Sequence, residues 1–276
     1  RVNSRRRSWR GRSSRDDREM TDHPRQTRDD TSAVKGYIHS IETMGTVDDG
    51  GIRFVLFMQG CAMRCVFCHN PDTWLRLGRE VSVDEVMKEI LDYKPFFEAS
   101  GGGVTVSGGE PLLQHRFVRA LFEACGRHGL HRALDTAGYC KHGDFESVLG
   151  CTDLLLFSIK VVDEEKHVRL TGVTNHVILA NLRLAAKRGM EIVVRYVLIP
   201  AINDSDDDLH DVAALVASLE GGTVRADILP YDRMGVAKWR QLGLDCALEG
   251  VPEPTPDDIA RARRIFHQHG VPLRTD

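Results

Sequence analysis

The sequence predicts an α/β fold in which parallel strands alternate with helices. From Lys35 onward, short apolar runs alternate with amphipathic segments of helical length, and this alternation is typical of βαβ units. The apolar runs are continuous, which favours strands buried on both faces. Six such units fit either a doubly wound sheet or a barrel that six units leave incomplete. Both architectures bind ligands at the carboxyl ends of their strands.

Six strands are expected, each a run rich in β-branched or large apolar residues. They are predicted at residues 52–58, 104–107, 132–135, 154–160, 192–199 and 224–229. Polar residues gather where these runs end, in the segments 59–68, 107–110, 135–136, 158–160 and 230–232. Because the carboxyl ends of parallel strands share one edge of a sheet, the candidate functional residues are expected to lie together there.

Six helices are expected between and after these strands, at residues 83–97, 116–128, 164–170, 177–188, 206–219 and 257–269. Ser82 before an acidic turn and the Asn203-Asp204-Ser205 segment before three aspartates are typical N-caps. Gly129 and Gly189 fall where helix C-caps are expected. No internal repeat or domain boundary interrupts residues 35–276, so a single domain is predicted there.

The composition excludes a membrane protein and argues against nucleic-acid binding. Apolar residues make up 42% and charged residues 28% of the 276 residues, and no apolar run approaches the roughly 18 residues that span a bilayer. Residues 1–34 hold ten arginines and six acidic residues, so the net charge of −3 leaves −7 for the remainder. A nucleic-acid-binding body should be basic. Residues 1–34, with almost nothing to bury, are predicted to form a disordered basic tail.

Three of the seven cysteines crowd into one loop directly after the first predicted strand. Cys61, Cys65 and Cys68 have the spacing CxxxCxxC. The others are scattered, at Cys125, Cys140, Cys151 and Cys246. A secreted disulfide framework would distribute paired cysteines over a shorter chain, so a reducing, cytoplasmic setting is predicted.

Three thiolates on one short loop can converge on one metal centre. Iron–sulfur clusters favour thiolate ligands, and a four-iron cube with three cysteines would leave one iron free for a substrate or cosubstrate. The alternative is a zinc site that adds His69 to the three cysteines. Structural zinc ligands usually come as two separated pairs, and a histidine adjacent to Cys68 shares a tetrahedron poorly.

A second motif, Ser107-Gly108-Gly109-Glu110-Pro111, follows the next predicted strand. Its two glycines allow a close backbone approach, and the carboxylate beside them can hold an ammonium group. Glycine pairs at strand ends are usually turns, so this motif alone is a weak signal.

A CxxxCxxC loop after one strand and Gly-Gly-Glu after the next resemble the radical S-adenosylmethionine (SAM) superfamily. Further segments resemble, in the same order, the pyruvate formate-lyase activating enzymes: CHNPDTW, SGGGVTVSGGEPLL, LDTAG, LTGVTNH, VVRYVLIP and LPYDRMG. Together with the segment before CHNPDTW they cover most of residues 36–270, and CHNPDTW is far more specific than the cysteine spacing. The resemblance implies an incomplete (β/α)6 radical SAM barrel, with parallel strands and outer helices, over residues 35–276.

The resemblance also implies the chemistry. Cys61, Cys65 and Cys68 would bind a [4Fe–4S] cluster whose open iron is chelated by SAM. An electron from the cluster would split SAM into methionine and a 5′-deoxyadenosyl radical, and that radical would take hydrogen from a glycine of formate acetyltransferase (pyruvate formate-lyase), its glycyl-radical partner. Such a radical must meet only its target, so a water-poor pocket is expected.

The resemblance implies further cofactor contacts. Phe67 would pack near the adenine, and Cys68 and His69 would contribute backbone contacts. Gly108, Gly109 and Glu110 would meet the methionine amino group. Asp135 would lie near the nucleoside or a bound monovalent cation, Lys160 near the cofactor and Arg195 near its carboxylate.

The chain departs from the family pattern at three places. Ser158 stands where the family typically has an aspartate that contacts the ribose or a cation, and Asp232 replaces a histidine. The loop usually written DGPG is Asp48-Asp49-Gly50-Gly51, which lacks the rigid proline. These changes bear on substrate identity more than on the type of reaction.

The sequence also bears on the source of the electron. The 38 residues between Cys68 and Ser107 hold no cysteine, so one cluster and a separate flavodoxin or ferredoxin donor are expected.

Three functions other than activation of formate acetyltransferase are open. They are an activase of another glycyl-radical enzyme, a radical SAM enzyme acting on a small molecule such as a deazaguanine precursor, and a non-catalytic metal-binding or electron-carrier module. A carrier does not need a barrel-sized body.

Overall fold

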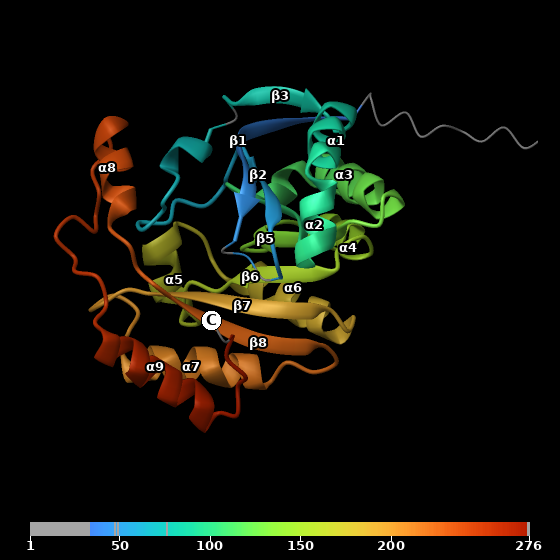
Figure 1. Cartoon of the computed structure of the whole chain (residues 1–276). Coiled ribbons are helices and arrows are strands. Elements are labelled where there is room, and N and C mark those ends of the chain that lie inside the picture. The colour runs from blue at the N-terminus through green and yellow to red at the C-terminus, as the bar shows by residue number, and fades with distance from the viewer. Residues whose placement is uncertain (1–33, 47, 49, 76, 275–276) are drawn as a thin grey trace, which may run out of the picture. The chain divides into compact units, whose positions relative to one another are not determined.

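The computed structural model describes residues 34–46, 48, 50–75 and 77–274. The described residues belong to one compact unit and contain an eight-stranded sheet with the order β3-β1-β2-β4-β5-β6-β7-β8 (Figure 1). The strands are β1 (Lys35–Gly45), β2 (Arg53–Met58), β3 (Arg79–Ser82), β4 (Gly103–Gly108), β5 (His131–Thr136), β6 (Leu154–Ser158), β7 (Glu191–Leu198) and β8 (Thr223–Pro230). The predicted disordered tail, residues 1–34, lies outside the described residues except for Val34.

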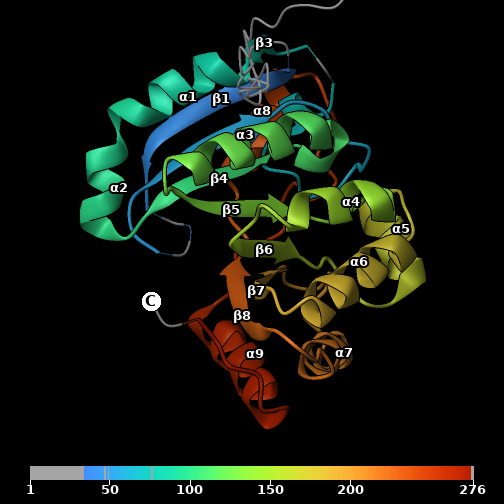
Figure 2. The same cartoon turned by 90° about the vertical axis from the view of Figure 1, so that its right-hand side faces the viewer.

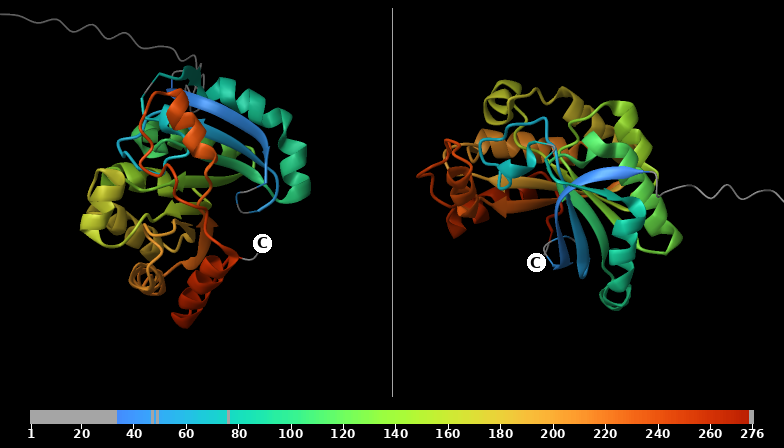
Figure 3. Two further views of the ribbon diagram at one scale, coloured as in Figure 1. Left: turned by 90° about the vertical axis from the view of Figure 1, so that its left-hand side faces the viewer. Right: turned by 90° about the horizontal axis from the view of Figure 1, so that it is seen from above.

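The six expected strands are confirmed as parallel neighbours. In the series β2, β4, β5, β6, β7 and β8, each strand pairs in parallel with the following one. A doubly wound sheet would reverse its strand order at a switch point, whereas this order runs in one direction. Figures 2 and 3 show α3, α4 and α6 on one face of the sheet and α8 over the other. The arrangement is therefore the incomplete barrel.

The helices are α1 (Val83–Asp92), α2 (Lys94–Ser100), α3 (His115–Arg127), α4 (His142–Leu149), α5 (Glu164–Thr171), α6 (His176–Lys187), α7 (Asp206–Ala217), α8 (Met234–Gln241) and α9 (Pro256–Gln268). Two short 3-10 helices, η2 (Pro71–Thr73) and η3 (Pro111–Gln114), follow β2 and β4. None of the described helices is both long and apolar enough to cross a bilayer.

The expected single helix over residues 83–97 is wrong, because the chain breaks into α1 and α2 at Tyr93. Pro95 has no amide hydrogen to donate back into the preceding turn, and its ring clashes there. It is tolerated in the first turn of α2, where amide groups lack helical partners anyway.

The predicted helix ends are largely confirmed. Ser82 forms a complete capping box with Glu85, and Gly129 and Gly189 have φ angles of 70° and 75°. Within the Asn203-Asp204-Ser205 segment, Ser205 is the cap of α7. Buried Asn203 instead holds the loop after β7, where its amide oxygen accepts from the amide of Ile199 at 2.8 Å.

Burial on both faces explains the continuous apolar runs. In β6, Leu155 and Phe157 belong to the core beneath the helices, whereas Leu154 and Leu156 pack in a small cluster on the opposite side. Beyond β2, the sheet is extended by β1, which pairs antiparallel with β2, and by β3, which pairs antiparallel with β1. The burial of β1 alternates along the strand, and its mixed sequence gives no continuous apolar signal. Neither β1 nor β3 was among the expected strands.

Candidate active site

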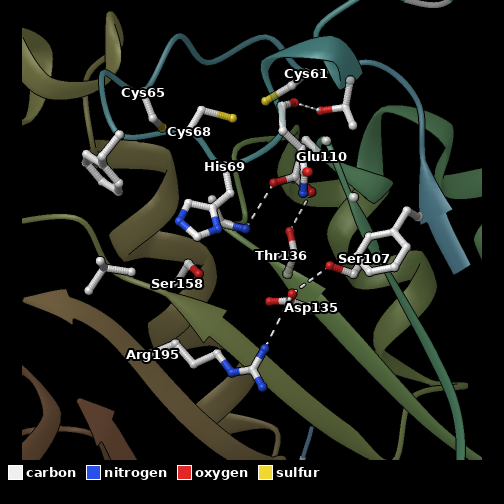
Figure 4. A pocket seen from close by; sticks show the side chains of 18 of the residues that line it. Cys61, Cys65, Cys68, His69, Ser107, Glu110, Asp135, Thr136, Ser158 and Arg195 are labelled. Atoms are coloured by element: carbon white, nitrogen blue, oxygen red, sulfur yellow. Dashed lines mark hydrogen bonds and ion pairs between the residues drawn. The ribbon is translucent and has the colours of Figure 1, made fainter. Parts of the chain in front are cut away.

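A pocket of about 550 Å³ opens at the carboxyl ends of the parallel strands. All of the site residues predicted from the sequence line it, and Figure 4 shows ten lining side chains by name. The predicted residues are Cys61, Cys65, Phe67, Cys68, His69, Gly108, Gly109, Glu110, Asp135, Ser158, Lys160, Arg195 and Asp232. Residues from six segments of the chain thus share one cavity, although their individual roles stay predictions.

The cysteine loop follows β2 and is fixed from two sides by backbone hydrogen bonds. The amide of Cys61 donates to the carbonyl of Trp74 at 3.2 Å. Between the cysteines, the amide of Arg64 donates to Thr171 at 2.8 Å and that of Val66 to Leu170 at 2.9 Å. Thr171 and Leu170 end α5, where helical carbonyls have no partners within the helix. The end of α5 therefore serves as the anchor of the loop.

Burial dominates the electrostatics of the three thiols. It raises the pKa of Cys61 to about 12 and that of Cys65 to about 11. Burial also raises the pKa of Cys68, although hydrogen bonds from the backbone of Asn70 and the side chain of Trp74 favour its thiolate. Metal binding would have to displace these protons, since thiolates are the ligands.

The zinc alternative gains no support from the geometry. The Nε2 atom of His69 lies 2.9 Å from the main-chain oxygen of Asp232, to which it can only donate. Among the residues with described positions, no three histidine, cysteine or acidic side chains are arranged to hold one metal ion. A mononuclear zinc site needs four donors within about 2.3 Å of one point, whereas a four-iron cluster takes one cysteine per iron.

The glycines after β4 bring two strand ends together. Gly108 has a φ of 112°, and a Cβ atom there would lie 2.3 Å from the amide nitrogen of Met58. A Cβ on Gly109 would lie 2.3 Å from the carbonyl oxygen of Gly60. The two glycines are therefore required for the close approach of this segment to the cysteine loop.

Glu110 is 1% exposed and already holds three hydrogen bonds. Its Oε1 atom accepts from the amide of Leu112 and the hydroxyl of Thr136, and Oε2 accepts from the amide of Ala137 at 3.0 Å. Burial raises the pKa of this carboxyl, and the three donors oppose the shift. A carboxylate has about four acceptor positions, so Oε2 retains one that a ligand could use.

A cluster of charged side chains lies near the ends of β4, β5 and β7. Asp135 accepts from the hydroxyl of Ser107 at 2.7 Å and faces Arg195 at 3.5 Å. Arg195 also donates to Asp48 at 2.8 Å. Burial raises the pKa of Asp135, and Arg195 opposes the shift. Burial by itself would lower the pKa of Arg195, but Asp135 and Asp48 raise it overall.

The remaining predicted residues also line the pocket. The Lys160 ammonium is 5.6 Å from the centre of the Phe67 ring, a cation–π contact that places a positive charge beside the ring. Ser158 ends β6 opposite Arg195 in β7. The Asp232 carboxylate accepts from the amide of Met234 at 2.7 Å, so this side chain shapes the start of α8.

Several lining or supporting residues were missed from the sequence. Thr136 and Asp48 lie in motifs that were noted, but nothing local indicates that they contact Glu110 and Arg195. Trp239 donates from Nε1 to the carbonyl of Cys68 at 2.8 Å, and 171 residues separate the two. No spacing rule could have found that contact.

Comparison with known proteins identifies the family. Residues 55–213 match the model of the Radical SAM superfamily. The chain is also 44% identical over 245 residues to a protein named pyruvate formate-lyase-activating enzyme from Staphylococcus epidermidis, with 86% of this chain and 97% of that protein covered. The chain belongs to this radical SAM family. The protein of the same name from Staphylococcus aureus shares the same identity and coverage.

Solved structures agree with the assignment. A crystallised domain of a pyruvate-formate lyase-activating enzyme from Bacteroides vulgatus is 27% identical, with a TM-score of 0.54 over 63% of this chain and 98% of that domain. A radical SAM methyltransferase from Sphaerobacter thermophilus, 17% identical, has a TM-score of 0.59 over 81% of this chain and 66% of its own. The latter likeness concerns the fold alone.

The pocket of this radical SAM family member fits the cofactors that the family implies, a [4Fe–4S] cluster and SAM. Three partly buried cysteines stand on one loop. The Nε atom of Arg195 is buried without a hydrogen-bond acceptor in the described part of the chain, so a donor is available to a carboxylate. The cavity also lies within the usual range for small-molecule sites, about 300–1,000 Å³.

Proposed function

We propose that this chain activates formate acetyltransferase (pyruvate formate-lyase) by removing a hydrogen atom from one of its glycines. The observation that carries the proposal is the gathering of all predicted cofactor residues around one pocket, in a chain 44% identical to enzymes named for this activity. When bound, the cluster and SAM supply the electron and the 5′-deoxyadenosyl radical that remove this hydrogen.

The residues of the chain have distinct tasks in this proposal. Cys61, Cys65 and Cys68 are the ligands of three irons. Arg195 directs its buried Nε donor to the SAM carboxylate, and the remaining acceptor position on Glu110 receives the ammonium group. The charges of the SAM carboxylate and ammonium group would both be paired inside the pocket. Such contacts are stronger there than in solvent, because the effective dielectric constant is lower.

Other parts of the pocket would receive the nucleoside. Phe67, 9% exposed, offers a ring face for the adenine, and Lys160 beside it adds a positive charge. Asp135 would lie near the nucleoside or a monovalent cation. Ser158 has no charge, so a cation at this place would depend on Asp135 and its neighbours.

The proposal also includes an electron donor and a cellular compartment. The described cysteines outside the loop do not form a second metal site, so the electron would come from a flavodoxin or ferredoxin. The chain would act in the cytoplasm, where a reducing environment preserves thiols and iron–sulfur clusters.

The test uses full-length chain reconstituted with iron and sulfide without oxygen. With SAM and reduced flavodoxin it should release 5′-deoxyadenosine, and on addition of formate acetyltransferase an electron paramagnetic resonance (EPR) signal of a glycyl radical should grow. The matched control is formate acetyltransferase with its target glycine replaced by alanine. SAM cleavage that yields this signal only with a different glycyl-radical enzyme would overturn the assigned substrate, and failure to bind iron would overturn the chemistry.

A further inference from the structure

Three side chains at the cysteine loop form a series of contacts, from Arg64 to Trp74 and from Trp74 to Trp239. The guanidinium carbon of Arg64 lies 5.0 Å from the centre of the Trp74 ring. Trp74 in turn meets Trp239 edge to face, with ring centres 5.2 Å apart and an interplanar angle of 87°. We call these residues the Trp74 trio. Both geometries are favourable, one as a cation–π contact and the other as an aromatic pair.

The trio is bonded to both ends of the cysteine motif. Arg64 donates from Nη1 to the carbonyl of Cys61 at 2.7 Å, and Trp239 donates from Nε1 to the carbonyl of Cys68 at 2.8 Å. The carbonyl of Trp74 accepts from the amide of Cys61 at 3.2 Å. Each member therefore binds the backbone of the first or the third cysteine, and their mutual contacts connect those two positions.

The element that carries Trp239 is fitted to the loop at further points. Lys238 of α8 donates to the side chain of Asn70 at 2.8 Å. A Cβ atom on Gly235 would lie only 3.0 Å from the ring of His69, so α8 approaches the loop closely. Trp239 itself is 7% exposed. Figure 3 shows α8 over the face of the sheet opposite α3 and α4.

We propose that Arg64, Trp74 and Trp239 are positioning residues that hold the first and third cysteines at the spacing a cluster requires. The proposal rests on the proposed ligand role of Cys61, Cys65 and Cys68. The trio touches none of the reacting atoms and acts through the backbone of the ligands. Partners that orient ligands in this way contribute strongly to metal retention, and their loss typically weakens it about 10- to 100-fold.

Two variants test the trio from opposite ends. Trp239→Phe keeps an aromatic ring against Trp74 but removes the N–H that binds Cys68. Arg64→Met keeps an apolar stem of similar length but removes the donor to the carbonyls of Cys61 and Met63. Each has a matched control: Arg240→Ala, whose side chain is 63% exposed one residue further along α8, and Arg169→Met, 67% exposed on α5.

The experiment measures cluster retention in iron-loaded protein without oxygen. Iron release to a chelator should be at least about tenfold faster in Trp239→Phe and Arg64→Met than in the wild type, and the EPR spectrum of the reduced cluster should broaden or shift. Both controls should match the wild type. The melting temperature of iron-free Trp239→Phe should stay within about 4 °C of the wild type, because one hydrogen bond is removed. That of Arg64→Met should stay within about 8 °C, because the two hydrogen bonds from Nη1 to the carbonyls of Cys61 and Met63 are removed.

The outcomes separate this inference from the proposed function. Wild-type protein that takes up four irons, together with variants that release iron at the wild-type rate and give its spectrum, would overturn the positioning role. A lower melting temperature with unchanged iron release and spectrum would overturn it too, since the trio would then be only a packing contact. If Trp239→Phe does not fold, Arg64→Met decides the question, because that side chain is exposed. Wild-type protein without iron would refute the proposed function instead.

Discussion

Glu110 joins two strand ends through one side chain. Its carboxylate accepts from Leu112 in its own segment and from Thr136 and Ala137 at the end of β5. The Thr136 hydroxyl also accepts from the amide of Gly138 at 2.8 Å, so its donor and acceptor capacities are both used. Such a buried network is favourable only while every member is satisfied.

Replacement of Thr136 by a residue without a hydroxyl should therefore lower the stability of the folded protein. Thr136→Val leaves the amide of Gly138 without its acceptor and the Glu110 carboxylate with one donor fewer. We expect the free energy of unfolding to fall by about 1–3 kcal/mol, measured by urea denaturation. Thr136→Ser retains the hydroxyl and should recover most of the loss; equal losses in the two variants would contradict this account.

Removal of a cysteine should affect the cluster and SAM cleavage only if that cysteine is a proposed ligand. Cys65→Ala should abolish both the cluster absorbance and SAM cleavage, because it removes one of three proposed ligands. Cys246→Ala is the matched control, since Cys246 packs beside a small apolar cluster and belongs to no cysteine motif. The measurements are iron content and 5′-deoxyadenosine release. A Cys65→Ala protein that keeps four irons and cleaves SAM would exclude Cys65 as a ligand.

At the scale of elements, an ion pair ties the start of β6 to β5. Asp153 accepts from the Arg132 guanidinium at 2.6 and 2.8 Å and from the Arg132 amide at 2.9 Å. Burial alone would raise the pKa of Asp153, but the hydrogen bonds from Arg132 lower it overall. Fork-like pairing of this kind fixes geometry as well as charge.

This pair should make stability depend on pH in the acid range. Because the folded-state pKa of Asp153 is lowered, its contribution is fully present above the unfolded value of about 3.9 and is lost as the pH falls through the folded value. Asp153→Asn should cost about 1 kcal/mol at pH 7, a figure reduced for the side chain's 34% exposure.

Denaturation of both proteins between pH 7 and pH 2 measures the effect. The difference in unfolding free energy should shrink toward low pH. A difference that stays constant over this range would show that the Asp153 charge does not contribute.

At the scale of the whole molecule, the cysteine loop is the one place that we propose for an iron–sulfur cluster. Of the other described cysteines, Cys125 and Cys151 are buried in the apolar core, and Cys140 and Cys246 are partly buried and pack against apolar clusters. Burial raises the pKa of Cys125 to about 12. We therefore expect the electron for catalysis to come from another molecule.

Iron content and reductant dependence test this expectation together. Reconstituted protein should bind about four irons per chain. SAM cleavage should be negligible with SAM alone and should begin when reduced flavodoxin, ferredoxin or a chemical reductant is added. Eight irons per chain, or a cluster signal that survives the loss of Cys61, Cys65 and Cys68, would contradict the prediction.

The sequence by itself determined the parallel strands and the residues of the pocket. Continuous apolar runs predicted β2 and β4 to β8 because both faces of these strands are buried. Polar residues at the run ends predicted the pocket because parallel strands carry their carboxyl ends to one edge. The order of specific segments then indicated the family, which the comparisons confirmed.

Only the tertiary structure decided how the pocket is held together. The sequential strand order excluded the doubly wound sheet, and β1, β3, α4 and α8 were not expected at all, because partly exposed elements carry weak periodic signals. The contacts of Trp239 with Cys68 and of Thr136 with Glu110 join residues far apart in the chain. Local patterns report which face of an element is buried, whereas the partner across a fold depends on how the elements pack.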